Sequence, residues 1–312
     1  MLLTGTFLDE ISHDIPHQNW GPHEWDLDFA HMKASGLDTV VVIRCGYRRM
    51  LTYPSAYLLK TQGCHAPETD LIDLFLTLAE KHGLGLYFGL YDTGKLWDTG
   101  RLEYEAEVNA HVSEEVWHRY GQRAAFRGWY LSAEISRNTS GAVKALHSMG
   151  RHCKELSGNL PVFLSPWMDG TKAVPAASAE LRKQGGVTLA THEREWDEIL
   201  GGLVGAVDAV AFQDGHVELH ELDAFFAVNK SLADRHGLQC WTNAETFDRD
   251  MPIKFLPIKW EKLRLKLEAA GRAGYDKAIT FEFSHFMSPQ SSYVQAHHLG
   301  HRYLEYRARH LS

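Results

Sequence analysis

Short runs of apolar residues alternate along this chain with longer amphipathic stretches. The apolar runs are rich in β-branched and aromatic residues and are bounded by turn residues, which is typical of strands buried on both faces. Eight such runs occur, at Leu3–Phe7, Thr39–Ile43, Gly85–Leu90, Gly128–Leu131, Pro161–Leu164, Val207–Phe212, Leu238–Trp241 and Lys277–Phe281. Their even spacing predicts parallel strands that are separated by helices.

The amphipathic stretches predict the helices. Trp25, Phe29 and Met32 are spaced by four and three residues, so they would lie on one helical face, and Gly36 follows where a helix would end. Helical patterns occur at Pro22–Ser35, Glu68–His82, Ala142–Leu156, Leu219–His236, Ile258–Ala273 and Ser291–His310. Several of them end in a glycine and a short link to the next strand, which is typical of the loop between a helix and a parallel strand.

This alternation predicts an α/β protein, a single (β/α)8 barrel domain over residues 1–312. An open doubly wound sheet is the alternative, but such a sheet usually carries a glycine-rich nucleotide loop, and the sequence has neither GxGxxG nor GxxxxGK. The segment 169–198 is longer than a connection from a strand to a helix requires. We therefore expect an elaborated loop and helix after the fifth strand.

Charge and composition narrow the classes of partner. The chain has 40 acidic and 32 basic residues, which disfavours binding to nucleic acid or to anionic membranes. No apolar run approaches the roughly 20 residues of a membrane span. The N-terminus lacks a basic leader and reaches Asp9 and Glu10 early, so we expect no signal peptide and a cytoplasmic protein. The four cysteines form no CxxC pair, which argues against a disulfide scaffold or a zinc ribbon.

Candidate chemistry lies at the C-terminal ends of the predicted strands, because these ends form the active face of a (β/α)8 barrel. Carboxylates converge here, but a merely solvated rim would favour Lys and Glu, whereas Trp, Tyr, Asn and Gln also gather at these ends, as in carbohydrate sites. The predicted substrate-binding residues are Asp9, Glu10, Arg44, Tyr47, Tyr91, Trp167, Gln213, Asp214, Asn243 and Glu282.

Glu134 and Glu245 follow the fourth and seventh predicted strands, which lie on opposite sides of a small barrel mouth. Hydrolysis of a glycosidic bond needs two carboxyl groups, one to protonate the leaving oxygen and one to attack or to activate water. We therefore predict that Glu134 and Glu245 are catalytic. The alternative for each is a salt bridge at the rim, for example with Arg44 or Arg137.

Glu282 is flanked by Phe281 and Phe283, which we expect to face the outer packing, so that Glu282 faces the barrel interior. A carboxylate there must be paired or hydrogen-bonded, or its pKa must rise. It would bind a substrate hydroxyl, orient a catalytic glutamate or serve as a third acid. A buried ion pair with Arg44 is the structural alternative.

A second hypothesis is a divalent-metal-dependent sugar isomerase, epimerase or lyase on the same barrel. Carboxylate-rich sites with one histidine suit Mn²⁺ or Mg²⁺. Strand ends would supply such a set in Glu134, Asp169, Asp214, His216 and Glu282. The sequence has no HxH or HExxH pair, and the leading interpretation includes no metal and no cofactor. A third hypothesis is a carbohydrate-binding barrel without catalysis.

Several segments also resemble a known family. The opening TGTFLDEISHDIPHQNWGPHEWDLDFAHMKASGLDTVVVIRCGYR resembles the start of the DUF4434 group of glycosidase-like barrel proteins, and GWYLSAEIS, AVAFQDG and ITFEFSHFMSP are similar to later segments of that group. The resemblance implies a barrel related to a large glycoside hydrolase clan, in which strand four supplies the acid/base and strand seven the nucleophile. These positions correspond to Glu134 and Glu245. Ala133 differs from the Asn that the clan usually has before the first glutamate.

Together these observations predict a glycoside hydrolase that acts on a small glycoside or oligosaccharide, with a carbohydrate as its partner. The sugar, the linkage, the retaining or inverting outcome and the oligomeric state stay open at the level of sequence.

Overall fold

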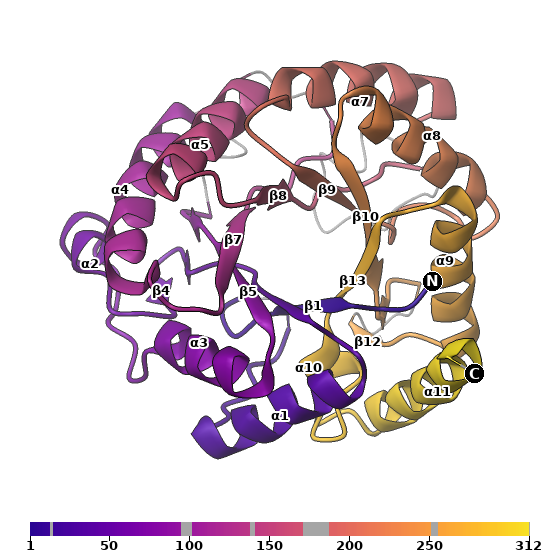
Figure 1. The fold of residues 1–312 in the computed structure, drawn as a ribbon, viewed down its shortest axis with the longest axis horizontal. Coiled ribbons are helices and arrows are strands. Elements are labelled where there is room, and N and C mark those ends of the chain that lie inside the picture. The colour runs from indigo at the N-terminus through magenta and orange to yellow at the C-terminus, as the bar shows by residue number, and fades with distance from the viewer. Residues whose placement is uncertain (13–14, 95–101, 138–140, 171–186, 251–254, 312) are drawn as a thin grey trace.

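A computed structural model describes residues 1–12, 15–94, 102–137, 141–170, 187–250 and 255–311. Eight parallel strands close into a barrel, in the order β1-β13-β10-β9-β8-β7-β5-β2. They are β1 (Gly5–Leu8), β2 (Thr39–Val42), β5 (Gly85–Gly89), β7 (Phe126–Leu131), β8 (Val162–Leu164), β9 (Ala209–Gln213), β10 (Gln239–Glu245) and β13 (Lys277–Phe281). Figure 1 shows the barrel surrounded by helices, which confirms the predicted fold.

The helices that surround the barrel are α1 (Pro22–Ala34), α3 (Leu71–His82), α4 (Leu102–Tyr120), α5 (Ala142–Leu156), α7 (Leu189–Leu203), α8 (Leu222–Arg235), α9 (Trp260–Ala273) and α11 (Val294–Leu311). Helix α4 is absent from the predicted set. The reason is that its buried face includes Glu105, Asn109 and Ser113 among the valines, which interrupts the apolar stripe. Within the described ranges, no helix has the length and apolar character that a membrane span requires.

Strand side chains alternate between two apolar clusters, one inside the barrel and one between the barrel and its helices. The inner cluster contains Phe7, Val41, Ile43, Tyr130, Phe163, Ala209, Ala211, Trp241 and Ile279. The alternation places Asn243 and Glu245 on the same side of β10 as Trp241. It likewise places Gln213 on the inner side of β9. Polar side chains thus cover the C-terminal end of an apolar barrel interior.

Short additional elements lie beyond the C-terminal ends of several barrel strands. β3 (Gly46–Tyr47), β4 (Met50–Leu51) and β6 (Tyr91–Asp92) form a small sheet, and β11 (Phe247–Asp248) pairs with β12 (Leu256–Pro257). Two short helices are α2 (Ala56–Thr61) and α10 (Phe283–Phe286). Of the elaborated segment expected at 169–198, residues 171–186 lie outside the described residues, and α7 forms its second part.

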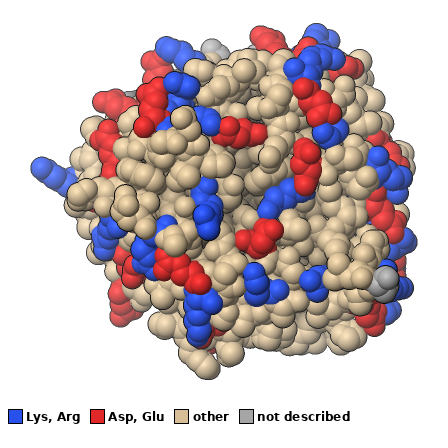
Figure 2. Space-filling view, in the orientation of Figure 1, with Lys and Arg blue, Asp and Glu red and all other residues tan. Residues whose placement is uncertain are grey.

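Charged side chains of both signs are interspersed on the face shown in Figure 2. Many of the exposed charges in the structure form ion pairs, for example Lys81 with Asp26 at 2.6 Å and Arg272 with Asp223 at 2.8 Å. Exposed pairs of this kind contribute little to stability. The exposed charges therefore do not point to a functional site. The buried charges at the C-terminal end of the barrel do.

Candidate active site

Arg44, which follows β2, is the centre of a charged cluster at the C-terminal end of the barrel. Its Nε lies 3.1 Å from Asp92 Oδ2 and its Nη2 lies 3.5 Å from Glu134 Oε1, while Nη1 donates a hydrogen bond of 2.9 Å to Ser12 Oγ. Burial lowers the pKa of Arg44, but the charges of Glu134, Asp92 and Asp9 outweigh burial and raise it. Arg44 therefore stays cationic, and it gathers carboxylates from three parts of the chain.

Asp9, after β1, has one satisfied and one unsatisfied carboxylate oxygen. Its Oδ1 accepts hydrogen bonds from the Ile11 and Ser12 amides at 3.0 and 2.9 Å. Among the described residues its Oδ2 has no hydrogen-bond partner, although Asp9 is only 2% exposed. A buried acceptor without a donor is costly, so this oxygen is suited to a ligand group that donates a hydrogen bond.

Glu10 forms part of the same loop. Its Oε1 accepts a hydrogen bond of 2.9 Å from the Gln18 amide, and burial raises the pKa of the Glu10 carboxyl.

Glu245, the last residue of β10, is 2% exposed and ion-paired through both of its oxygens. Arg249 Nε and Nη2 each donate a hydrogen bond of 2.7 Å to its carboxylate. Burial raises the pKa of Glu245, but the charges of Arg249, Lys266 and His216 and the Arg249 hydrogen bonds lower it further than burial raises it. Glu245 is therefore held in its ionised form, which is the form that a carboxylate nucleophile needs.

Asp214 and Lys266 hold the main chain of Glu245. Asp214 Oδ1 accepts from the Glu245 amide at 3.1 Å, and Lys266 Nζ donates to the Glu245 carbonyl oxygen at 3.0 Å. The two side chains are themselves paired at 2.6 Å. Burial raises the pKa of Asp214 to about 6, against the opposing charge of Lys266. The structure thus places Asp214, a predicted substrate residue, toward Lys266 on α9.

Gln213, Asn243 and Trp167 lie next to one another at the ends of β8, β9 and β10. Gln213 Nε2 donates to the Ser165 carbonyl oxygen at 2.8 Å, and Asn243 Nδ2 donates to Ser165 Oγ at 3.0 Å. Trp167 forms a β-bridge with Gln213. Asn243 Oδ1 and Trp167 Nε1 are buried and have no hydrogen-bond partner in the part of the chain that the structure describes. Asn243 Oδ1 could therefore accept a hydrogen bond from a ligand, and Trp167 Nε1 could donate one.

The two predicted tyrosines differ in their surroundings. The guanidinium groups of Arg44 and Arg48 lie 5.5 and 5.0 Å from the centre of the Tyr47 ring, so Tyr47 adjoins the charged cluster. Tyr91 instead packs in the cluster between barrel and helices, and its hydroxyl donates to the Arg48 carbonyl oxygen. Burial raises the pKa of the Tyr91 hydroxyl. Of the two, only Tyr47 lies next to Arg44.

The predicted orientation of Glu282 is wrong. Phe281 packs against the inner cluster, and Glu282 is the N-cap of α10, where its carboxylate accepts from the Ser284 and His285 amides at 2.8 and 2.6 Å. Its ion-pair partner is His285. The chain begins α10 directly after β13, so the alternation of the strand does not extend to Glu282.

Three residues that are not among the predicted catalytic and substrate-binding residues are important in the site. Asp92 follows the third barrel strand and was recognisable by that position alone. Arg249 lies four residues after Glu245. Where the chain turns, side chains at this separation can meet, so the opposite charges were a signal for this pair. Lys266 comes from the middle of α9, and no local pattern connects it with Glu245.

Three of the five residues of the metal hypothesis take separate partners in the structure. Asp214 pairs with Lys266, Glu282 caps α10 and pairs with His285, and Glu134 pairs with Arg44. Among the residues that the structure describes, no group of three or more His, Cys, Asp or Glu side chains is arranged to hold a metal ion.

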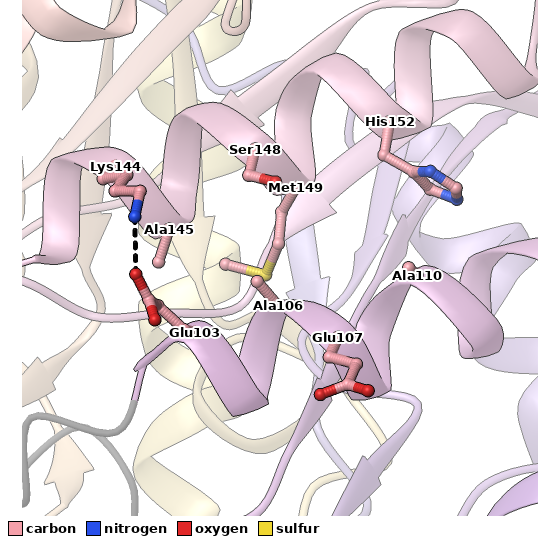
Figure 3. A pocket seen from close by; sticks show the side chains of 9 residues that line it. All are labelled: Glu103, Ala106, Glu107, Ala110, Lys144, Ala145, Ser148, Met149 and His152. Atoms are coloured by element: carbon pink, nitrogen blue, oxygen red, sulfur yellow. Dashed lines mark hydrogen bonds and ion pairs between the residues drawn. The ribbon is translucent and has the colours of Figure 1, made fainter.

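A groove of about 440 Å³ lies between α4 and α5, outside the barrel (Figure 3). Alanines line much of it, and Lys144 spans it to Glu103 at 2.6 Å. Both charges are thereby neutralised. The remaining lining includes His152, whose buried Nε2 lies 3.7 Å from Glu114 Oε1.

Comparison with known proteins agrees with the fold and confirms the family that the opening segment resembles. The model of a family described as a domain of unknown function (DUF4434) matches residues 3–293. A protein of Bacteroides thetaiotaomicron, provisionally named an alpha-L-fucosidase, has 62% sequence identity and a TM-score of 0.92; the match covers 98% of this chain and 92% of that chain. A comparison with curated proteins finds no match.

Two more distant structures share the fold. An endo-1,4-beta-D-mannanase from Thermotoga petrophila is 13% identical, with a TM-score of 0.56 and coverage of 90% of this chain and 87% of that chain. An intracellular xylanase from Thermoanaerobacterium saccharolyticum is 12% identical, with a TM-score of 0.52 and coverage of 90% and 85%. The structural neighbours thus include glycoside hydrolases with a (β/α)8 barrel.

Proposed function

We propose that this chain, which belongs to the DUF4434 family, is a glycoside hydrolase in which Glu134 is the general acid/base and Glu245 the nucleophile. The observation that carries the proposal is the contrast between these two glutamates. Glu245 is buried and held ionised by Arg249, whereas the Glu134 side chain is 25% exposed beside Arg44. Two carboxyl groups in different environments are suited to two different roles.

The substrate would be bound by the unsatisfied polar groups at the mouth. A sugar carries hydroxyl groups that both donate and accept hydrogen bonds. Such hydroxyls would donate to Asp9 Oδ2 and Asn243 Oδ1 and accept from Trp167 Nε1. These three atoms are buried, and no described residue forms a hydrogen bond with them. Tyr47 would offer an aromatic face beside Arg44. A small glycoside therefore fits the chemistry of the site.

In the proposed reaction, Glu134 protonates the glycosidic oxygen while the Glu245 carboxylate attacks the anomeric carbon. Glu134 then takes a proton from the water that releases the sugar. This sequence is the retaining one, which requires carboxyl groups about 5 Å apart. The 62% identical protein, with its provisional name, makes an α-L-fucoside the first substrate to examine.

A panel of 4-nitrophenyl glycosides, with the α-L-fucoside first, tests the proposal. Glu134→Gln and Glu245→Gln should each lower turnover by about 10²- to 10⁴-fold while both variants remain folded. Glu245→Gln should also lower the melting temperature, because it breaks the buried pair with Arg249. Glu114→Gln, on the exposed side of α4, is the matched control and should retain full activity. Wild-type turnover in both active-site variants, or saturable sugar binding by a wild type that turns over none of the panel, would contradict the proposal.

A further inference from the structure

The Asp214–Lys266 ion pair lies directly behind Glu245 and is almost completely buried. Asp214 is 1% exposed and Lys266 is 5% exposed. Burying two charges removes both from water, and their attraction often does no more than offset that loss. Stability alone is therefore a weak explanation for this pair.

The contacts of the pair indicate another role. Lys266 and Asp214 bind each other and also both hydrogen-bonding groups of the Glu245 main chain, the amide through Asp214 Oδ1 and the carbonyl oxygen through Lys266 Nζ. The side chain of Glu245 is fixed separately, by Arg249 through both oxygens. Together these contacts leave the end of β10 little freedom to move.

We infer that Asp214 and Lys266 are positioning residues, which fix the main chain at Glu245 so that its carboxylate points into the barrel mouth. The inference rests on the proposed role of Glu245 as nucleophile. In this assignment neither Asp214 nor Lys266 touches the substrate, so both residues act through Glu245. Precise support of this kind matters because a displacement of about 1 Å at a reacting group lowers turnover on the order of 10²-fold.

A pair with similar contacts but greater exposure lies at the opposite end of the barrel. The Lys154 and Asp208 side chains are 10% and 42% exposed, against 6% and 0% for Lys266 and Asp214. Lys154 of α5 donates to Asp208 Oδ1 at 2.7 Å, and Asp208 Oδ2 accepts from the Val162 amide at 2.8 Å. As at Glu245, a helical lysine and an aspartate next to a strand hold a strand amide. Asp208 and Val162 lie at the N-terminal ends of β9 and β8, away from the candidate site. Lys154→Met is therefore a control for the general effect of breaking such a pair.

The experiment compares Lys266→Met with Lys154→Met in the full chain. Turnover is measured with the 4-nitrophenyl glycoside that the wild type hydrolyses. Lys266→Met should lower kcat on the order of 10²-fold with little change in KM, and Lys154→Met should leave kcat within about 2-fold of the wild type. A kcat for Lys266→Met equal to that of Lys154→Met would overturn the inference.

A second readout needs no substrate. The Glu245 carboxyl carbon is titrated by ¹³C NMR after selective glutamate labelling, with Glu245→Gln to assign the signal. The charged groups that face this carboxyl are Arg249, Lys266, His216 and Asp214. Lys266→Met should raise the pKa of Glu245, because a nearby positive charge is lost, and Lys154→Met should not change it. An unchanged titration in Lys266→Met would overturn the inference even if the wild type hydrolyses no glycoside in the panel.

If Lys266→Met does not fold, Asp214→Asn takes its place. The amide oxygen can still accept from the Glu245 amide, but the ion pair is gone. A lower kcat together with a changed Glu245 titration supports the inference, and wild-type values of both overturn it.

Discussion

A methyl group added at Gly215 should displace the carboxylate of Glu245. An alanine Cβ at this position would lie 1.8 Å from Glu245 Oε2 and 2.5 Å from Arg249 Nε. Ordinary van der Waals contact begins at 3.4 Å, so the carboxylate would have to retreat by about 1.6 Å. Gly215 does not have a positive φ, so alanine fits the backbone and the clash is the only new strain.

The expected loss of turnover follows from this displacement. A misplacement of about 1 Å at a reacting group costs on the order of 10²-fold, so Gly215→Ala should lower kcat by at least about that factor. Overpacking of one methyl group costs about 1–3 kcal/mol, so the variant should remain folded.

The assay measures kcat and KM with the glycoside that the wild type hydrolyses, together with the melting temperature. Gly201→Ala is the control, because the nearest atoms to its Cβ would be those of the His236 ring, at 3.2 Å and beyond, in the outer layer of helices. Gly201→Ala should retain wild-type turnover. A Gly215→Ala variant with wild-type kcat would show that the carboxylate position does not limit the reaction, and the argument from geometry would fail.

Two further predictions concern stability. Burial lowers the pKa of His285, but the charge and hydrogen bond of Glu282 raise it to about 9, above the ordinary value of 6.5; the resulting stabilisation is full below about pH 6.5 and is lost as the pH rises through 9. Urea unfolding of the wild type and His285→Gln should therefore show a difference in stability that shrinks between about pH 6 and pH 10. A difference that stays constant over this range would refute the raised pKa of His285. Phe29 is fully buried and stacks on Phe75 with ring centres 5.8 Å apart, so Phe29→Ala should lower the free energy of unfolding by about 3–5 kcal/mol in the same assay, and a loss below about 1 kcal/mol would contradict its place in the core.

The barrel strands were predictable because each has to be buried on both faces. Lys277–Phe281 has the same bounds in prediction and structure, and Thr39–Ile43 differs from β2 by one residue. Helix α4 was not predictable from its apolar pattern, because Glu105 and Asn109 lie on its buried face. There they bind Thr93 and Tyr91, which is a tertiary reason that no local periodicity shows.

The sequence by itself determined the barrel and the approximate place of each strand, because strand periodicity is a local property. It placed Glu245 after a strand predicted to end at Trp241, whereas β10 continues to Glu245. The tertiary structure alone decided how the charges pair. Arg44 meets Asp92 and Glu134, which follow different strands, and Lys266 reaches Glu245 from a helix that begins 15 residues after it. The tertiary structure also decided the orientation of Glu282, which caps α10 because the alternation of strand β13 ends before it. Ion pairing depends on distances between groups far apart along the chain, and only the closed barrel sets those distances.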